Sequence, residues 1–436
     1  MMSAELRRNL WLEISLTRLI VIPLILALVL WSLAITGDTI NYQLLGGAAL
    51  MLFGLICIIW GANLASSSIT EEAQAQTWDW QRLSSQTPSE LVLGKLFGST
   101  VLAWYGGAWC LSAYVVFTLL AGDTPVISWL FLSVAGAIFF HASAMLLTLS
   151  TPPEQRPVYQ QKRGIGAVKL LLLLLILLAL QSLGSLIFLS DKGAIATVGW
   201  HGADFSLLTF VTVSTIVWAG WAVFGCLQRL STLLRCPTTP TPWLLFVVWC
   251  MVYLSGFTLD SLASIKATLP ATTYFGIAAY LVAVALTWGL AWQEDKAPVQ
   301  WRLWLAAWHN RQYSLLWQRT PRWIATLPLI VIALSVSLLH AEMPAPWLLS
   351  APLLLLLRDT AVLYGLCWTP ERKRPQLAFT IYLLLVYVLL PYLLTSLRPI
   401  FYPSFENPVL SISAFGIEVV FAAAFCLYRW RKYYKN

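Results

Sequence analysis

The sequence is poor in charge. Only 11% of its 436 residues are Asp, Glu, Lys or Arg, whereas a water-soluble domain has charges at about a quarter of its positions. This scarcity excludes a soluble enzyme and a nucleic-acid-binding protein, and an apolar share of 59% excludes a disordered chain. The mean hydropathy of +0.75 indicates a polypeptide that lies largely in lipid.

Catalytic and metal-binding motifs are also missing. The nearest string to a phosphate loop is Gly94-Lys95-Leu96, which lacks the upstream glycine and the magnesium-binding hydroxyl. The four histidines are far apart with no HExxH, no GxSxG elbow occurs, and none of the seven cysteines is in a CxxC pair. We therefore predict no catalytic residue, no metal and no cofactor on this chain.

Long apolar runs fill most of the chain. Because a membrane-spanning helix needs about 20 apolar residues, the sequence predicts an all-α polytopic membrane protein with about twelve spans. The candidates are 17–36, 43–64, 91–121, 125–149, 167–190, 206–227, 243–260, 272–293, 323–340, 346–367, 376–396 and 411–428.

Basic residues divide the connections into two sets. One set, which includes both chain ends, holds 21 of the 27 Lys and Arg, and the other holds only Lys192, Lys266 and Arg398. Basic residues near span ends are retained in the cytoplasm. Both termini are therefore predicted to be cytoplasmic, and no outer connection is long enough to form a receptor domain.

Two amphipathic segments and two groups of spans organise the chain. Residues 1–16 are expected to form a cytoplasmic interfacial helix, and 294–322 a cytoplasmic amphipathic segment. Residues 17–293 then form a first bundle of about eight spans with a cytoplasmic helix at 68–85, 323–428 a second bundle of about four, and 429–436 a basic tail. An internal duplication relating 16–25 to 320–330 is left open.

The connection at 65–95 has an unusual composition for a cytoplasmic loop. Ser68 and Glu71 have the spacing of a capping box, which predicts a helix beginning near residue 69, with Glu71 and Glu72 in its first turn. Trp78 and Trp80 follow beside charged residues, a combination that protein contact surfaces favour. The alternative is that both tryptophans lie against lipid headgroups.

This connection resembles the cytoplasmic loop of ABC transporter permeases of the type 2 exporter class. The resemblance covers about 30 residues and rests on Thr77-Trp78-Asp79, Arg82-Leu83, Pro88, Glu90 and Leu93-Gly94-Lys95. The chain departs from that family at Gln76, where a glycine is usual, and at Ser84-Ser85, where Thr-Pro is usual. Family members commonly have six spans, so one chain or two could form the pathway.

The resemblance implies a mechanism and a partner. A dimer of ABC ATPase subunits, which carries the ATP and magnesium, would bind the cytoplasmic side and move this helix. The implied ATPase-coupling residues are Glu71, Glu72, Thr77, Trp78, Asp79, Arg82, Gly94 and Lys95. The expected location is a bacterial plasma (inner) membrane, with membrane lipids and a second permease chain as further partners.

Three ionisable residues fall inside predicted spans. Arg358 and Asp359 are neighbours in the run at 346–367, and Glu418 lies in the last span. Because neighbours on a helix point about 100° apart, we expect Arg358 and Asp359 to pair with other spans, with Glu418 as the partner of Arg358. They form either part of a translocation route or a buried structural clamp.

The leading hypothesis is thus the membrane subunit of an ATP-driven exporter. The alternatives are a self-sufficient polytopic enzyme or secondary carrier for a lipid-like substrate, and a membrane scaffold on which an ATPase does mechanical work. The transported substrate is not predicted, because no pocket motif occurs in the sequence.

Overall fold

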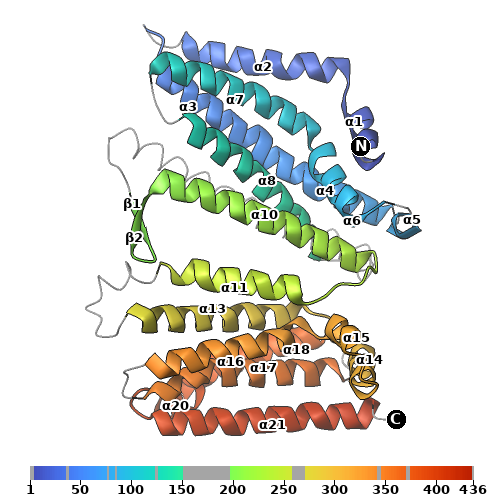
Figure 1. Cartoon of the computed structure of the whole chain (residues 1–436), viewed down its shortest axis with the longest axis vertical. Helices are drawn as coiled ribbons and strands as arrows, with labels where there is room; N and C mark the ends of the chain where they lie inside the picture. Colours follow the sequence, from blue (N-terminus) through green and yellow to red (C-terminus); the bar gives the residue numbers. More distant parts are fainter. Residues whose placement is uncertain are drawn as a thin grey trace. The chain divides into compact units, whose positions relative to one another are not determined.

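The computed structural model describes residues 4–35, 39–75, 78–83, 86–122, 126–150, 197–257, 271–340, 345–369 and 374–434. Within these ranges the chain is almost entirely helical (Figure 1). Ten helices among the described residues are long and apolar enough to cross a membrane. This confirms the helical, multi-pass character predicted from composition. The predicted span 167–190 lies outside the described residues, and the span predicted at 243–260 is a shorter apolar helix of 15 residues.

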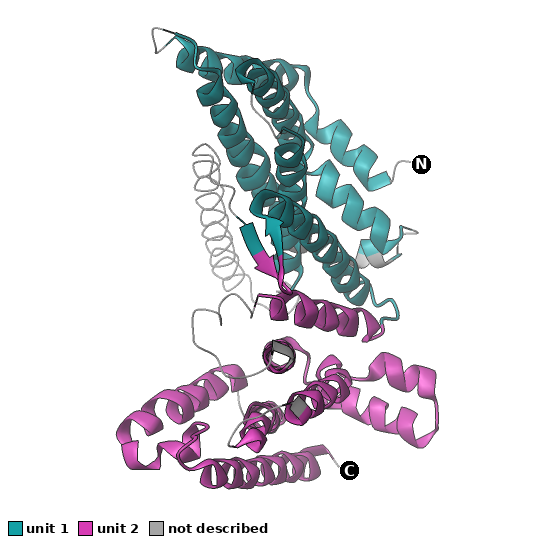
Figure 2. Ribbon diagram, turned by 60° about the vertical axis from the view of Figure 1, so that its left-hand side comes forward, with its two compact units in different colours: residues 1–198, 204–238 teal, residues 199–203, 239–436 magenta. Residues whose placement is uncertain are grey.

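The chain divides into two compact units, coloured separately in Figure 2. Unit 1 comprises residues 1–198 and 204–238, and unit 2 comprises 199–203 and 239–436. The boundary differs from the predicted one at 293, because the helix at 271–293 packs closely on the helices at 322–340 and 241–255. Each unit contains five of the ten candidate spans.

Unit 1 contains a short N-terminal helix, a set of long apolar helices and four short elements of five to seven residues. Its elements are α1 (Ala4–Glu13), α2 (Leu16–Ala34), α3 (Tyr42–Phe53), η1 (Gly54–Trp60), α4 (Gly61–Gln74), α5 (Trp78–Leu83), α6 (Pro88–Leu93), η2 (Gly94–Gly98), α7 (Val101–Ala121), α8 (Val126–Ser150) and α10 (Leu207–Leu233).

Unit 2 also consists of long apolar helices with short helical elements between them. Its elements are α11 (Thr241–Ser255), α13 (Ala271–Gln293), α14 (Pro298–His309), α15 (Tyr313–Arg319), α16 (Arg322–His340), η4 (Pro346–Ser350), α17 (Ala351–Cys367), α18 (Pro375–Leu384), η5 (Leu385–Leu389), α19 (Leu390–Leu393), η6 (Thr395–Leu397), α20 (Arg398–Phe401) and α21 (Pro408–Tyr434).

A small hairpin is the one departure from helical structure in the described ranges. Strands β1 (Thr197–Trp200) and β2 (Ala203–Ser206) form a two-stranded sheet. The two residues between them, His201 and Gly202, have φ of 51° and 77°. A two-residue turn with both φ values positive matches the right-handed twist of the strands. The sequence prediction missed this hairpin because His-Gly is a weak turn signal.

The helix starts follow local chemistry. Ser15 and Asn41 accept hydrogen bonds from the backbone N–H groups of Arg18 and Leu44, and so cap α2 and α3. Pro298 and Pro375 occupy the first positions of α14 and α18, where a missing N–H costs nothing. These boundaries therefore arise from residues that are close in sequence.

In the part of the chain that the structure describes, three segments are π-helical: η1, η2 and η5. A π-helical turn inserts an extra residue, leaves backbone groups free for side chains and is common at functional sites. In η1, the carbonyl of Cys57 is 2.7 Å from Nε2 of His141, a fully buried residue of α8. A side chain at Gly61 would meet this ring, because its Cβ would lie 2.2 Å from His141 Nε2. His141 therefore belongs to the helix packing of unit 1.

Candidate functional site

The first site is a cluster of buried charges where α1, α4 and η2 meet in unit 1. Lys95, the second residue of η2, is 1% exposed. Its ammonium Nζ lies 3.4 Å from Oε1 of Glu5 in α1 and also contacts Oε1 of Glu72 near the end of α4. We call Glu5, Glu72 and Lys95 the Lys95 cluster. Because a buried charge is strongly unfavourable without a partner, the two carboxylates hold Lys95 in place.

Two glycines let α1 approach η2 closely enough to form the Lys95 cluster. A Cβ on Gly94 would lie 2.8 Å from the Cβ of Glu5, and a Cβ on Gly98 would lie 2.9 Å from the Cβ of Asn9. Asn9 Nδ2 also donates to the carbonyl of Gly94 at 3.3 Å and to Oε1 of Glu5 at 3.4 Å. The Gly-Lys pair is thus a docking site for the N-terminal helix.

The close approach of α1 to Gly94 can be tested with two glycine-to-alanine variants. Gly94→Ala is expected to push α1 away from η2 and to lower stability by about 1–3 kcal/mol, the usual cost of overpacking. Gly47→Ala in α3 is the control, because a Cβ there meets nothing within 4 Å. Thermal unfolding of the detergent-purified protein measures both. Equal unfolding temperatures for the two variants would contradict the packing described for Gly94.

The segment between α4 and α6 projects an exposed apolar pair. On α5, the side chains of Trp80 and Leu83 are 77% and 82% exposed. They are three residues apart, so they lie on the same side of the helix. Large apolar side chains with this exposure are available for contact with lipid headgroups or with another protein.

Helix α6 has its own start signal. Thr87 Oγ1 accepts from the backbone N–H of Glu90, and the Glu90 carboxylate accepts from the backbone N–H of Thr87 at 2.9 Å, which completes a capping box. These hydrogen bonds stabilise the ionised carboxylate and hold the pKa of Glu90 below its usual range. Thr87-Pro88 is therefore the turn that leads into α6 and η2.

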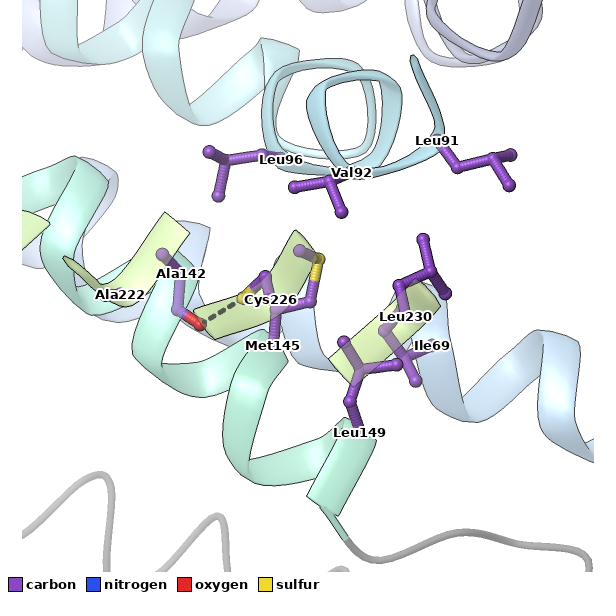
Figure 3. Packing of buried hydrophobic residues seen from close by; sticks show 10 residues of the cluster. All are labelled: Ile69, Leu91, Val92, Leu96, Ala142, Met145, Leu149, Ala222, Cys226 and Leu230. Carbon is purple, nitrogen blue, oxygen red and sulfur yellow. Dashed lines mark hydrogen bonds between the residues drawn. The ribbon is translucent and has the colours of Figure 1, made fainter. Parts of the chain in front are cut away.

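Helix α6 and η2 are anchored in the core of unit 1. Leu91, Val92 and Leu96 face α8 and α10 in Figure 3. The remaining residues of this core, drawn in the same view, are Ile69, Ala142, Met145, Leu149, Ala222, Cys226 and Leu230. Cys226 Sγ donates to the carbonyl of Ala142 at 3.1 Å, which joins α10 to α8. A displacement of α6 would therefore be transmitted to both long helices.

The helix boundaries in residues 65–95 differ from those predicted from the sequence. The capping box predicted at Ser68 and Glu71 is wrong, because α4 runs unbroken to Gln74 and Ser68 Oγ donates to the carbonyl of Ala65. Of the helix predicted over 68–85, the structure describes the end of α4 and α5 (Trp78–Leu83), and residues 76–77 and 84–85 lie outside the described residues.

The residues named for ATPase coupling have different environments. Glu71 is exposed, whereas Glu72, Gly94 and Lys95 are partly or fully buried and contact one another or α1. Thr77 and the side chains of Trp78, Asp79 and Arg82 lie outside the described residues. The sequence prediction missed Glu5 and Asn9, because nothing local marks them as partners of residues about 90 positions away.

The second site is a buried charge network in unit 2. Arg358 Nη1 donates to Oε2 of Glu418 at 2.6 Å, as predicted. Its Nε donates to Oδ1 of the neighbouring Asp359 at 2.9 Å, so the prediction that the neighbours do not pair is wrong. The angle of about 100° between neighbours fixes Cβ directions only, and a long arginine side chain can fold back.

Aromatic donors complete the network around Asp359. Its carboxylate accepts from the hydroxyl of Tyr387 at 2.8 Å, the hydroxyl of Tyr382 at 3.3 Å and Nε1 of Trp288 at 3.3 Å. The Arg358 guanidinium lies 5.1 Å from the Tyr387 ring centroid, within cation–π range. We call these six residues the Arg358 network: Trp288, Arg358, Asp359, Tyr382, Tyr387 and Glu418. The sequence prediction missed its aromatic members, because tyrosine and tryptophan are common throughout the spans.

The described ranges contain no candidate metal centre. They contain no group of three or more His, Cys, Asp or Glu side chains arranged to hold a metal ion. Comparison of the sequence and structure with models of known protein families, with curated proteins and with solved structures finds no match. The function must therefore be argued from the two charged sites and the packing of the helices.

Proposed function

We propose that this chain is the membrane subunit of an ATP-binding cassette exporter of the type 2 class, driven by ATPase subunits on separate chains. The observation that supports this function best is the Lys95 cluster. It joins the N-terminal helix α1 to the end of the second apolar helix and to the start of the third. These last two lie before and after the segment that contains α5, which we place in the cytoplasm. This arrangement suits a subunit that receives force on that segment.

The proposed path of force begins at α5. Trp80 and Leu83 would contact the ATPase, and α5 would displace α6 and η2 when the ATPase subunits close on ATP. Lys95 would carry the displacement to α1 and α4 through Glu5 and Glu72. Leu91, Val92 and Leu96 would carry it to α8 and α10 through their shared core. A charged contact and an apolar contact thus act on the same short element.

The two units have a common packing order, which supports a single chain with two equivalent halves. In each unit the second and third apolar helices pack closely, as α3 with α7 and α13 with α16. The predicted span 167–190 is counted as the fifth apolar helix of unit 1. The fourth and sixth apolar helices then also pack closely in each unit, as α8 with α10 and α17 with α21. This equivalence pairs α16 with α7, not with α2 as the duplication between 16–25 and 320–330 would require.

A carboxylate near the end of the second helix links it to the third in both halves. Glu72 reaches Lys95 in unit 1. In unit 2, Glu294 Oε1 accepts from the backbone N–H of Arg322 at 2.8 Å, at the start of α16. Burial raises the pKa of Glu294 above its ordinary value. The segment between Glu294 and Arg322, which contains α14 and α15, is the position at which a second ATPase subunit would act.

This proposal includes twelve spans, both termini in the cytoplasm and a location in a bacterial inner membrane. The support is the strong bias of Lys and Arg toward one set of connections. One chain would then form the whole pathway and bind two ATPase subunits. The transported substrate stays open.

The proposed contact predicts a crosslinking result in cells. A photoreactive amino acid in place of Leu83 should crosslink to a polypeptide that contains a phosphate loop, because this side chain is 82% exposed on α5. Trp80→Ser in the same chain should reduce that crosslink by about tenfold or more, as expected for the loss of a large aromatic contact. The purified complex should contain one permease chain and two ATPase chains by mass.

The control places the photoreactive amino acid at Phe405, which is 65% exposed and follows α20 in a predicted outer connection. It should give no ATPase crosslink. A Leu83 probe that captures no nucleotide-binding chain, in cells that express the protein at native levels, would remove the basis for the proposed function.

A further inference from the structure

A groove runs along the first apolar helix of unit 1. It has a volume of about 440 Å³, which lies in the range of small-molecule binding sites. Val21 and Ile22 of α2 form one wall, and Trp60, Leu64 and Leu102 from η1, α4 and α7 form the other. Leu26 is the only buried side chain of α2, so the first two turns of this helix, which line the groove, are not closed against its other wall.

The walls of the groove suit a hydrocarbon chain. All five side chains just named are apolar, and α2 is one of the helices long and apolar enough to cross a membrane. A groove of this kind in a membrane helix bundle is filled by acyl chains, because no water reaches the hydrocarbon region.

One end of the groove is charged. Arg18 and Glu13 line it together with Thr17, at the bend between α1 and α2. Arg18 Nη1 donates to Oε2 of Glu13 at 2.8 Å and to the Glu13 carbonyl at 3.0 Å. The side chains of Arg18 and Glu13 are 52% and 39% exposed. Among the described residues, Nε and Nη2 of Arg18 donate to no side chain and to no carbonyl. Both charged groups therefore have capacity for a ligand.

One positive and one negative group side by side complement a zwitterion. A phosphate would accept from the free nitrogens of Arg18, as guanidinium groups favour, and an ammonium would lie against the Glu13 carboxylate. A purely anionic headgroup would meet repulsion from Glu13. Free phosphate would leave the apolar walls unfilled.

We propose that this groove binds one aminophospholipid of the cytoplasmic leaflet, of the phosphatidylethanolamine type. The phosphate binds Arg18, the ammonium binds Glu13, and one acyl chain lies between α2 and the wall formed by Trp60, Leu64 and Leu102. The site goes beyond the proposed function and rests on it only for the side of the membrane, the cytoplasmic leaflet. Since α1 carries Glu5 of the Lys95 cluster, a lipid at the bend after α1 also holds that helix in position.

Photolabelling tests the site directly. The purified full-length protein is placed in phosphatidylcholine nanodiscs that contain a small share of phosphatidylethanolamine with a photoreactive acyl chain. Labelled peptides should map to residues 17–22, 60–64 and 102. Arg18→Gln should lower this labelling by about tenfold, the effect of losing one charge-assisted hydrogen bond. Arg311→Gln, at an exposed arginine of unit 2, is the control and should leave labelling unchanged.

A second variant tests the headgroup chemistry. The wild type should prefer labelled phosphatidylethanolamine to labelled phosphatidylglycerol, and Glu13→Gln should remove that preference without lowering phosphatidylglycerol labelling. Leu64→Trp should block labelling by filling the groove while both charges stay in place, so it serves as an independent check if Arg18→Gln folds poorly. Equal labelling by the two lipids in the wild type would overturn the proposal. So would labelling spread evenly over lipid-exposed helices such as α21, which would indicate unspecific annular lipid.

Discussion

Lys95→Met is expected to lower the stability of the protein by about 3–5 kcal/mol, the cost of removing one partner from a buried ion pair. The substitution removes the cation and leaves both carboxylates of the Lys95 cluster in place. Glu5 and Glu72 are only 9% and 14% exposed in their side chains, so two carboxylates would be close together without the ammonium that contacts both of them. Glu5 would keep a longer contact of 3.6 Å with Arg8, whose side chain is 63% exposed. The helix α1 should then detach from η2, because like charges repel strongly in a poorly solvated site.

Thermal unfolding of the detergent-purified protein measures this loss. The observable is the fraction of the protein that stays monodisperse after heating. Detachment of α1 can be read separately from the protease sensitivity of the bond after Arg7 or Arg8. A compensated variant keeps the experiment informative: Lys95→Met combined with Glu5→Gln and Glu72→Gln has no uncompensated charge and should recover most of the stability. If the single and compensated variants unfold at the same temperature, the Lys95 cluster does not stabilise unit 1 electrostatically.

Glu72 is part of the Lys95 cluster, so its substitution affects folding as well as any contact with an ATPase. A residue that only contacts an ATPase could be replaced by arginine without loss of folding. In the Lys95 cluster, however, Glu72→Arg would place a second cation against buried Lys95. Tests of coupling therefore belong at Trp80 and Leu83, which are exposed, and not at Glu72.

Arg358→Leu is expected to have an effect of similar size in unit 2, again about 3–5 kcal/mol. The Arg358 and Asp359 side chains are 4% and 2% exposed, and Asp359 would keep its aromatic donors but lose its cation. Three aromatic side chains bind Asp359 at fixed positions. A network in which so many groups are satisfied favours a structural clamp over a mobile translocation route.

Glu418→Gln is the matched control for Arg358→Leu. The Glu418 side chain is 27% exposed, and a glutamine there still offers an oxygen to Arg358, so the expected loss is only about 1 kcal/mol. Thermal unfolding and expression level measure both variants. Normal stability of Arg358→Leu together with lost transport would show that the Arg358 network serves the route and not the fold.

Much of the architecture could be predicted from sequence because it depends on local composition. A run of about 20 apolar residues must be helical in lipid, since no water satisfies its backbone groups. Glu418 could be predicted as a partner of Arg358, because a buried arginine needs an acid and few acids occur in the spans.

Other features depended on residues far apart in the chain. Ser68 and Glu71 have the spacing of a capping box, but the apolar core around Ile69 keeps α4 helical through them. The boundary expected near 293 moved to 238, because α13 packs with α16 and α11 and not with the helices before it. No sequence pattern specifies which helices pack together.

The sequence by itself determined that the chain is a helical, multi-pass membrane protein with few charges in its apolar runs. These properties follow from transfer free energies and charge counts, which add up residue by residue. Only the tertiary structure decided how Lys95 is neutralised, which aromatic groups surround Asp359 and where the two units divide. Each of these depends on a close approach between segments, such as α1 on Gly94, and a close approach is set by the packing of the whole unit and not by any stretch of sequence.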